Sequence, residues 1–420
     1  MRRPRVAIVV TGSELVRGER TDLNGPFYAR EALLLGLQPV RIAIVGDDPD
    51  ELETALREGF EADVCLVSGG LGPTHDDRTI ELVARVAGRS LRLDSALETE
   101  IEQISRRFAE RLRRPYADFA DGVRKQATLP EGALSLGLAG TAPGVVLEAG
   151  ACVVIVLPGP PAELQRLWPR AVACQPLQRV LARTTRPDRR VLRFYGASES
   201  VIARTLADAG GDGDGVEVTI CARDFEIHVD LIVEPGSGGR ADALESALVE
   251  PLAEYLFGRD ERSVQELVLE LCRARGLTLG TAESCTGGLV AARLTSVAGA
   301  SEVFRGGVVA YDDRLKEALL GVPTDLLATH GAVSAEVAAA MAHGARERVG
   351  VDVAVSVTGV AGPGGGRAEK PVGLVFFHVA GPTGEMSLRF EIPGEREWIR
   401  TRSAVVALHL VRRLLAPSPG

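Results

Sequence analysis

The sequence contains very little lysine. Of its 48 basic residues, 45 are arginine, and only Lys125, Lys316 and Lys370 are lysine. Arginine keeps its proton at working pH, whereas a lysine with a lowered pKa can act as a base. Each lysine lies in a motif-like stretch, GVRKQA, YDDRLK or GGGRAEKPVG. Two interpretations follow: the three lysines remain by chance, or the amine itself is needed at these positions.

Long apolar runs are also missing. The longest, VVIVL at residues 153–157, is stopped by PGPP and is far shorter than the roughly 20 residues that span a bilayer. The apolar stretch within the N-terminal MRRPRVAIVVTGSE is too short for a signal peptide. We therefore expect a cytoplasmic protein without a membrane partner.

The sequence shows no paired or clustered metal-binding residues. Its six cysteines form no CxxC pair, and its six histidines form no HxxxH or His/Cys cluster. This spacing predicts reduced, buried thiols and argues against a structural or catalytic zinc site. The net charge of −9 argues against general nucleic-acid binding, which depends on neutralising phosphates. We therefore expect small-molecule substrates.

The order of strand-like and helix-like segments predicts an α/β protein of three domains, because 420 residues exceed one ordinary core. Residues 1–172 alternate strands and helices, which predicts a parallel, doubly wound sheet. Residues 173–257 indicate a small α+β domain with VEVTICA and EIHVDLIVE as a hairpin, and residues 258–420 return to α/β alternation. The small middle domain suggests a role in assembly, and we expect a homodimer.

The stretch SGGLGPTHDDRT, residues 68–79, places a glycine-rich turn between a buried strand and a helix start. Backbone N–H groups in such a turn can cradle an anion. Asp76 and Asp77 would repel a phosphate unless a divalent metal lies between them. The alternative is that they only interact favourably with the helix dipole. Glu14, in TGSE, follows another strand and would reach the same crevice.

Several N-terminal motifs together resemble one known domain. TGSELVRGERTDLNG, VGDD, SGGLGPTHDD, RKQATLPEGA and GTAPG are similar to the molybdopterin-binding-like domain of the competence/damage-inducible CinA family, over most of residues 1–170. The resemblance implies a three-layer fold and ADP-ribose pyrophosphatase activity that requires Mg²⁺, Mn²⁺ or Co²⁺, with K⁺ as a further candidate ion. The expected metal ligands are Asp76, Asp77 and Glu14, and the expected substrate-binding residues are Gly69, Gly70, Gly72, Thr74 and Lys125.

A second candidate site starts at TAESCTGG, residues 281–288, where an apolar run meets an alanine-rich helical pattern. Ser284 needs a base, and Lys316 follows the strand-ending Tyr311 by five residues. We predict a serine amidohydrolase in which a desolvated lysine with lowered pKa is the base and the tyrosine relays or orients the proton. N–H groups at the start of a helix over residues 285–296 would hold the oxyanion.

The alternatives at this site remain open. Ser284 and Thr286 are also typical helix caps, Lys316 can be a surface cation, and Cys285 is a competing nucleophile. A third glycine-rich loop, SVTGVAGPGGG, would bind the polar end of a nucleotide-like substrate.

The C-terminal motifs resemble a second domain of the same family. ESCTGG, YDDRLK, GAVSAEVAAAMAHGA, VTGVAGPGGG, EKPVG and GEREWIR are similar to the CinA C-terminal domain, which is also found alone as nicotinamide mononucleotide deamidase, over residues 258–415. The resemblance implies hydrolysis of the nicotinamide carboxamide, without a cofactor, by the catalytic residues Ser284, Tyr311 and Lys316. The expected substrate-binding residues are Glu283, Cys285, Thr286, Gly287, Thr358, Gly359, Arg396 and Arg400.

The chain departs from the family pattern at both sites. Asp312 and Asp313 replace the serine-asparagine or threonine-asparagine pair that usually follows the tyrosine, and Arg367 replaces a serine. Near the N-terminal site, Ser13 stands where threonine is usual and Val123 where asparagine is usual. The alternative function is a pterin- or nucleotide-binding protein in which one or both sites are inactive. In the middle domain, GGDG at 210–213 has the spacing of a KH-domain loop, but its aspartates would repel phosphates.

Overall fold

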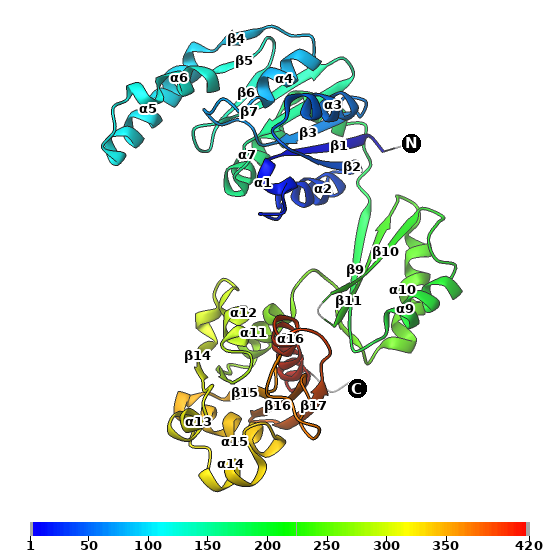
Figure 1. Ribbon diagram of the computed structural model, residues 1–420. Coiled ribbons are helices and arrows are strands. Elements are labelled where there is room, and N and C mark those ends of the chain that lie inside the picture. Colours follow the sequence, from blue (N-terminus) through cyan, green and yellow to red (C-terminus); the bar gives the residue numbers. More distant parts are fainter. Residues whose placement is uncertain (1–2, 224, 417–420) are drawn as a thin grey trace. The chain divides into compact units, whose positions relative to one another are not determined.

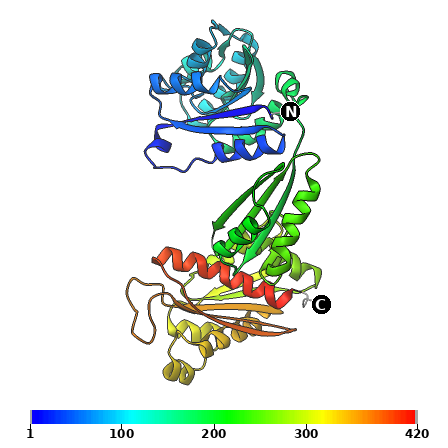
Figure 2. The ribbon, with the colours of Figure 1, turned by 90° about the vertical axis from the view of Figure 1, so that its right-hand side faces the viewer.

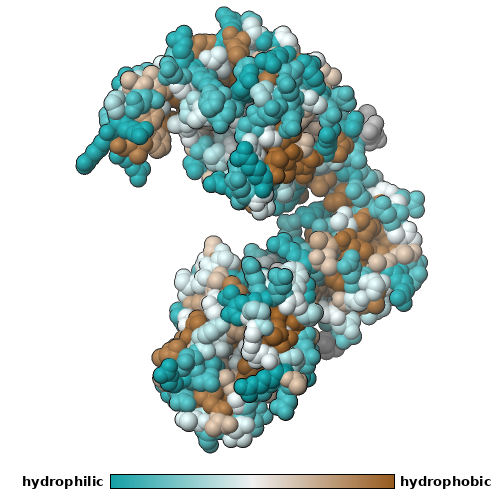
Figure 3. All heavy atoms as spheres, viewed as in Figure 1, coloured by the Kyte–Doolittle hydropathy of each residue, from teal (hydrophilic) through white to brown (hydrophobic). Residues whose placement is uncertain are grey.

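The computed structural model describes residues 3–223 and 225–416 and divides the chain into two compact units, Met1–Asp188 and Arg189–Gly420 (Figure 1). Helix α8 (Gln175–Leu181) belongs to the first unit, where Leu177 and Val180 pack into the core. The predicted domain boundaries at residues 172 and 257 stay a prediction. Within the described ranges, no helix combines the length and the apolar character that crossing a membrane requires. The face drawn in Figure 3 is largely hydrophilic with scattered apolar patches.

The first unit is built on a sheet of order β2-β1-β3-β8-β7-β6. Its strands are β1 (Arg5–Thr11), β2 (Gln38–Val45), β3 (Val64–Ser68), β6 (Leu134–Leu138), β7 (Pro143–Ala149) and β8 (Cys152–Leu157). β1 is parallel to β2 and β3, and β3 is parallel to β8, but β7 and β6 run antiparallel. The prediction of a parallel sheet is therefore wrong for β6 and β7. Residues 150–151 join β7 to β8, and so short a connection permits only antiparallel pairing.

Helices cover both faces of this sheet, so the unit has three layers (Figure 1, Figure 2). The helices are α1 (Ser13–Val16), α2 (Asn24–Leu34), α3 (Pro49–Gly59), α4 (Thr79–Val86), α5 (Ser95–Leu112), α6 (Ala117–Gln126), α7 (Pro161–Ala173) and α8; the small strands β4 (Leu91–Leu93) and β5 (Thr128–Pro130) pair with each other. Side chains alternate between the two cores along β1: Val9 packs with α3 and α4, whereas Ile8 and Val10 pack with α2 and α7.

The second unit begins with a sheet of order β10-β11-β9-β12. It contains β9 (Asp188–Tyr195), β10 (Val216–Arg223), β11 (Glu226–Val233) and β12 (Leu256–Gly258), with helices α9 (Glu199–Asp208) and α10 (Gly238–Leu252) packed into one core with its strands. The predicted hairpin is confirmed, because β10 and β11 pair antiparallel from Val216 with Val233 to Arg223 with Glu226.

A second sheet of the same unit has the order β14-β13-β15-β16-β17. Its strands are β13 (Leu279–Glu283), β14 (Phe304–Val309), β15 (Val353–Gly359), β16 (Leu374–Gly381) and β17 (Gly384–Glu391). One face packs against α11 (Val264–Ala274), α12 (Leu289–Thr295) and α16 (Arg396–Leu415), and the other against α13 (Asp313–Leu320), α14 (Thr324–His330) and α15 (Ala335–Ala345). A 3-10 turn (Ala300–Glu302) and a π-helix (Arg346–Gly350) complete it. β13 is parallel to both of its neighbours, whereas β16 and β17 are antiparallel.

A buried histidine of α16 contacts the first sheet of this unit. The Nε2 atom of His409 lies 2.7 Å from Oε1 of Glu226 on β11, and its ring stacks on Tyr195 of β9 at 3.7 Å. Burial lowers the pKa of His409 to about 4, although Glu226 opposes this shift. Burial raises the pKa of Glu226, but hydrogen bonds from His228 and His409 outweigh it and bring that pKa to about 2. A neutral His409 therefore donates to an ionised Glu226.

The low pKa of His409 in the folded protein predicts a loss of stability in mild acid. The pKa of an unfolded histidine is about 6.5, so the unfolded chain takes up this proton first as the pH falls. The free energy of unfolding then decreases between about pH 6.5 and pH 4, by up to about 1.4 kcal/mol per pH unit. We expect the melting temperature of His409→Gln to fall less between pH 7 and pH 5 than that of the wild type. His75→Gln is the control, because the His75 side chain is fully exposed; equal falls in all three proteins would contradict the prediction.

Candidate active sites

The carboxyl ends of β13, β14 and β15 lie at one edge of the second sheet of the second unit. Glu283, the last residue of β13, pairs with Val309 of β14 and Val357 of β15. The predicted site residues that end or follow these strands are Ser284, Tyr311, Lys316 and Thr358. Parallel pairing therefore brings them to the same edge, as the sequence predicted.

Ser284 lies in a tight turn between β13 and α12. Its backbone N–H donates to the carbonyl of Val357 at 2.9 Å, and its side chain is largely buried. Gly287 and Gly288 have φ values of +61° and +95°, which only glycine adopts readily. A side chain at Gly287 would also lie 3.2 Å from the guanidinium of Arg400. The two glycines therefore let the chain turn sharply enough to place the serine at the sheet edge.

Arg400 of α16 holds this turn from outside. Its Nε donates to the carbonyl of Cys285 at 3.0 Å, and its Nη2 donates to the carbonyl of Thr286 at 2.9 Å. These bonds fix the residues directly after Ser284. Arg400 was expected to bind substrate; in this structure two of its nitrogens are bonded to the turn and position the serine.

Arg396 joins two other parts of the site. Its Nη2 donates to the Tyr311 hydroxyl at 2.6 Å, and its Nη1 donates to the carbonyl of Gly362 in the third glycine-rich loop at 2.6 Å. The Tyr311 side chain is itself exposed. Arg396 therefore sets the position of the tyrosine hydroxyl relative to the loop.

Lys316 is one of the most deeply buried side chains of the protein, with 1% of its surface exposed. Its Nζ lies 3.2 Å from Oδ1 of Asp313 and 3.5 Å from the backbone carbonyl of Tyr311. Asp312 caps the helix that carries the lysine by accepting from the N–H of Arg314. The alternative that Lys316 is a surface cation is therefore wrong. Asp313, a departure from the family pattern, is its ion-pair partner.

The structure changes the expected role of Glu283. Helix α12 begins at Leu289 and not at residue 285. The N–H groups of Gly288, Val290 and Ala291 donate to the Glu283 carboxylate at 2.9, 3.1 and 2.9 Å. This buried carboxylate caps the helix, although it was predicted to bind substrate. It also occupies N–H groups that were expected to hold an oxyanion, so oxyanion donors would have to come from the turn before the helix.

The competing nucleophile, Cys285, is buried, and burial raises the pKa of its thiol to about 12. A thiol with such a pKa carries almost no thiolate at neutral pH, which favours Ser284 as the nucleophile. Thr286 is also buried, and its hydroxyl has no hydrogen-bond partner within the described part of the chain. Thr358 donates its hydroxyl to the carbonyl of Ala332 at 2.7 Å and so ties β15 to the loop before α15.

Gly359, which follows Thr358, has no room for a side chain, because a Cβ atom there would lie 2.7 Å from the carbonyl oxygen of Leu374. Arg367, the other departure from the family pattern, exchanges backbone hydrogen bonds with Lys370 in the loop after the glycines.

The capping role of Glu283 predicts a stability defect. Glu283→Gln places an NH₂ donor against three N–H donors, so we expect a loss of about 1–3 kcal/mol in the free energy of unfolding, measured by urea denaturation. Glu302→Gln is the control, because Glu302 pairs with Arg273 at the exposed surface and should change stability by less than about 0.5 kcal/mol. An unchanged unfolding midpoint in Glu283→Gln would contradict the capping role.

A cavity of about 520 Å³ in the first unit contains most of the residues predicted for the N-terminal site. Its lining includes Thr11, Gly12, Glu14, Asp22, Asn24, Asp47, Ser68, Gly69, Gly70, Asp76, Asp77 and Gly159. Asp22, Asn24 and Asp47 had been given no role. Asp47 follows the end of β2, so the rule that located Glu14 could also have found it. Its carboxylate accepts from the backbone and hydroxyl of Ser13 at 3.0 and 2.6 Å.

The predicted metal ligands share this cavity but do not form a compact set. The Asp77 carboxylate accepts from the N–H and hydroxyl of Thr74 at 3.0 and 2.5 Å. Glu14 folds back over Gly12, where a Cβ atom would lie 3.0 Å from Oε2 of Glu14. Within the described ranges, Glu14, Asp76 and Asp77 do not bring three ligand atoms within 4.8 Å of one another. Carboxylate oxygens suit Mg²⁺ or Mn²⁺, so the donors fit such an ion once side chains move.

The glycine turn is as tight as predicted. Gly70 has φ +63°, and a Cβ atom there would lie 2.1 Å from Oγ1 of Thr79. Gly72 and Lys125 line a smaller cavity of about 270 Å³, together with Gly70 and Asp77. Lys125 donates to the backbone carbonyl of Thr74. Burial lowers the pKa of Lys125, while Asp77 and Asp76 oppose this shift.

Comparison with known proteins gives matches over both units. The family model for the CinA C-terminal domain matches residues 261–415, and that for a probable molybdopterin binding domain matches residues 7–177. CinA-like proteins of Mycolicibacterium vanbaalenii and Mycobacterium tuberculosis are 46% and 43% identical, over 98% and 99% of this chain and 98% of each relative. A solved competence/damage-inducible protein of Agrobacterium tumefaciens is 41% identical over 38% of this chain and 99% of its own, with a TM-score of 0.35.

Proposed function

Because this chain belongs to the CinA family, we propose that its C-terminal region hydrolyses nicotinamide mononucleotide to nicotinic acid mononucleotide and ammonia. The observation that carries this proposal is that a positioned serine and a fully buried lysine both follow strands that end at the same edge of one sheet. Ser284 is held there by the bonds of Glu283 and Arg400 to its turn, and Lys316 follows the neighbouring strand. A buried lysine does not serve as a solubilising surface cation, so we attribute its position at this edge to a chemical role.

The proposed reaction passes through an acyl-serine. The Ser284 hydroxyl attacks the carboxamide carbon and gives its proton to the amine of Lys316, while Tyr311 orients or relays that proton. The tetrahedral intermediate then expels ammonia, which receives the proton from the lysine. Water attacks the acyl-serine with the same lysine as base, which releases the carboxylate and restores the serine. Every step uses side chains of this chain.

We expect Ser284→Ala and Lys316→Arg to lower ammonia release from nicotinamide mononucleotide at least about 100-fold, with a chelator present throughout. Lys316→Arg keeps a cation beside Asp313 but cannot accept a proton, so it separates the base from the ion pair. Matched controls are Ser296→Ala, at the exposed end of α12, and Lys370→Arg, whose lysine donates to the backbone carbonyl of His330. Ammonia release by Ser284→Ala at the wild-type rate would contradict the serine assignment. A wild-type chain without activity would favour the binding-protein alternative.

For the first unit we propose metal-dependent hydrolysis of ADP-ribose to AMP and ribose 5-phosphate. The support is the cavity that joins a glycine turn, suited to a pyrophosphate, with carboxylates suited to a divalent ion. Glu14, Asp76 and Asp77 would hold the ion, which would neutralise the phosphates and activate water. Lys125, beside the same turn, would contact a phosphate oxygen.

This second activity predicts the opposite response to chelation. AMP release should require added Mg²⁺, Mn²⁺ or Co²⁺ and should fall at least about 100-fold in Asp77→Asn, because the ion loses a ligand. Asp118→Asn, on helix α6 outside the cavity, is the control. Binding of ADP-ribose without AMP release under any of these metals would favour a nucleotide-binding role. Chelation separates the two sites in one chain, because the proposed deamidase needs no metal.

A further inference from the structure

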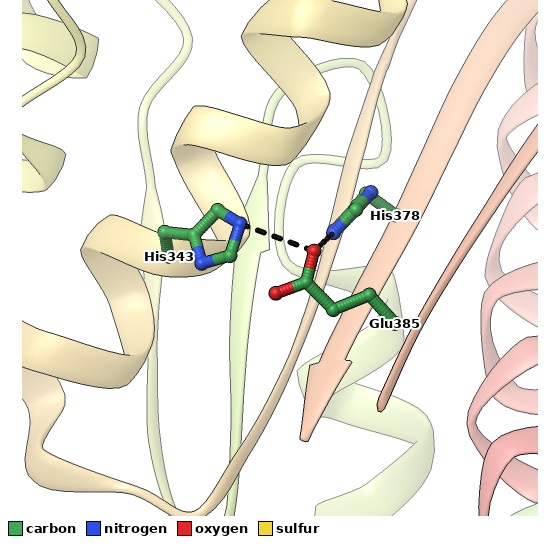
Figure 4. Close-up of side chains that lie close together, drawn as sticks. All are labelled: His343, His378 and Glu385. Atoms are coloured by element: carbon green, nitrogen blue, oxygen red, sulfur yellow. Dashed lines mark ion pairs between the residues drawn. The ribbon is translucent and has the colours of Figure 1, made fainter. Parts of the chain in front are cut away.

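Two histidines and a glutamate from three different elements converge in the second unit (Figure 4). His343 lies in the last turn of α15, His378 in the middle of β16, and Glu385 near the start of β17. Their ligand atoms all lie within 4.8 Å of one another, and among the described residues they are the one such group of histidine, cysteine, aspartate or glutamate side chains. None of them belongs to the proposed catalytic sets.

Two of the three distances between these atoms match the edges of a metal tetrahedron. Oε2 of Glu385 lies 3.4 Å from Nε2 of His343 and 3.4 Å from Nε2 of His378. Zn²⁺ binds such nitrogen and oxygen atoms at about 2.0–2.1 Å, so neighbouring ligands around a tetrahedral ion are about 3.3–3.4 Å apart. An octahedral ion with bonds of that length would bring them to about 2.9 Å.

The surroundings of His378 suit a metal ligand. Its side chain is 6% exposed, and its Nε2, which faces Glu385, has no hydrogen-bond partner within the described part of the chain. Its Nδ1 lies 2.8 Å from the hydroxyl of Ser387, its cross-strand neighbour on β17. When Nδ1 donates to that hydroxyl, Nε2 carries the lone pair, which is the arrangement found for metal-binding histidines.

We propose that His343, His378 and Glu385 form a Zn²⁺ site that joins the end of α15 to the β16–β17 hairpin. The His343 and Glu385 side chains are each about half exposed, so the fourth position of the ion opens to solvent. The site does not rest on the proposed deamidase or pyrophosphatase activity.

The competing explanation is an ion pair between Glu385 and a protonated histidine. The buried Nε2 of His378 faces the Glu385 carboxylate at 3.4 Å, which is the spacing of two ligands on one tetrahedral ion, so the geometry favours the metal. The two explanations differ in whether the protein takes up zinc.

The test is zinc uptake by the full chain. Protein stripped with a chelator is dialysed against Zn²⁺ in excess Mg²⁺, which occupies the carboxylate cavity of the first unit but competes poorly for imidazole. We expect one Zn²⁺ per wild-type chain by atomic absorption, and an affinity at least about tenfold lower in His343→Ala and in Glu385→Gln. Co²⁺ in place of zinc should give the strong visible absorption of a tetrahedral site in the wild type and not in these two variants. Zinc uptake by His343→Ala equal to that of the wild type would overturn the proposal.

The matched control is His330→Ala. His330 is also an exposed histidine beside a glutamate, 3.5 Å from Glu336, but the described residues around it supply no third ligand of this kind. This variant should take up zinc like the wild type. Zinc should also raise the melting temperature of the wild type and of His330→Ala, and not that of His343→Ala, because an ion bound only by the folded state stabilises it. An unchanged far-ultraviolet circular dichroism spectrum of Glu385→Gln would show that the variant is folded.

Discussion

The buried carboxylate of Glu283 is the interaction on which the proposed deamidase site depends. It accepts three backbone N–H groups and fixes where α12 begins, while Arg400 binds the carbonyls of the same turn from the other side. The Glu283 carboxylate accepts from N–H groups at the end of this turn, and the Arg400 guanidinium donates to its carbonyl groups. Ser284 directly precedes the residues bonded in this way, and its own backbone N–H donates to the carbonyl of Val357 on β15.

The surroundings of the three lysines give a physical reason why lysine, and not arginine, stands at two of these positions. The three lysines differ in their surroundings: Lys316 is fully buried against Asp313, Lys125 is partly buried beside a carboxylate cavity, and Lys370 bonds to a backbone carbonyl. An arginine could replace the last of these without loss of its hydrogen bond. It could not supply the small amine that the other two positions place next to acidic groups. Asp313 makes this chain unusual, because a carboxylate now pairs with the proposed base.

Spacing along the chain did not predict which charged groups and possible metal ligands lie together in the fold. The scattered histidines argued against a zinc site, yet His343 and His378, 35 positions apart, meet because α15 packs on β16. The β16–β17 hairpin then brings Glu385 beside them. Conversely, Glu14, Asp76 and Asp77 reach one cavity as predicted, but the carboxylates of Glu14 and Asp77 turn toward their own loops. Local hydrogen bonds compete with metal binding, and a strand-end rule does not weigh them.

The sequence by itself determined the alternation of strands and helices, the hairpin of β10 and β11, and the strand-end positions of both candidate sites. These features depend on local periodicity and on the rule that parallel strands end at one edge. Tertiary structure decided the antiparallel side of the first sheet, the use of Glu283 as a cap, the role of Arg400 in positioning the serine, and the histidine cluster. Each of these depends on which groups, distant in the sequence, pack together. A buried hydrogen-bond donor or acceptor pairs with the partner that this packing brings close to it.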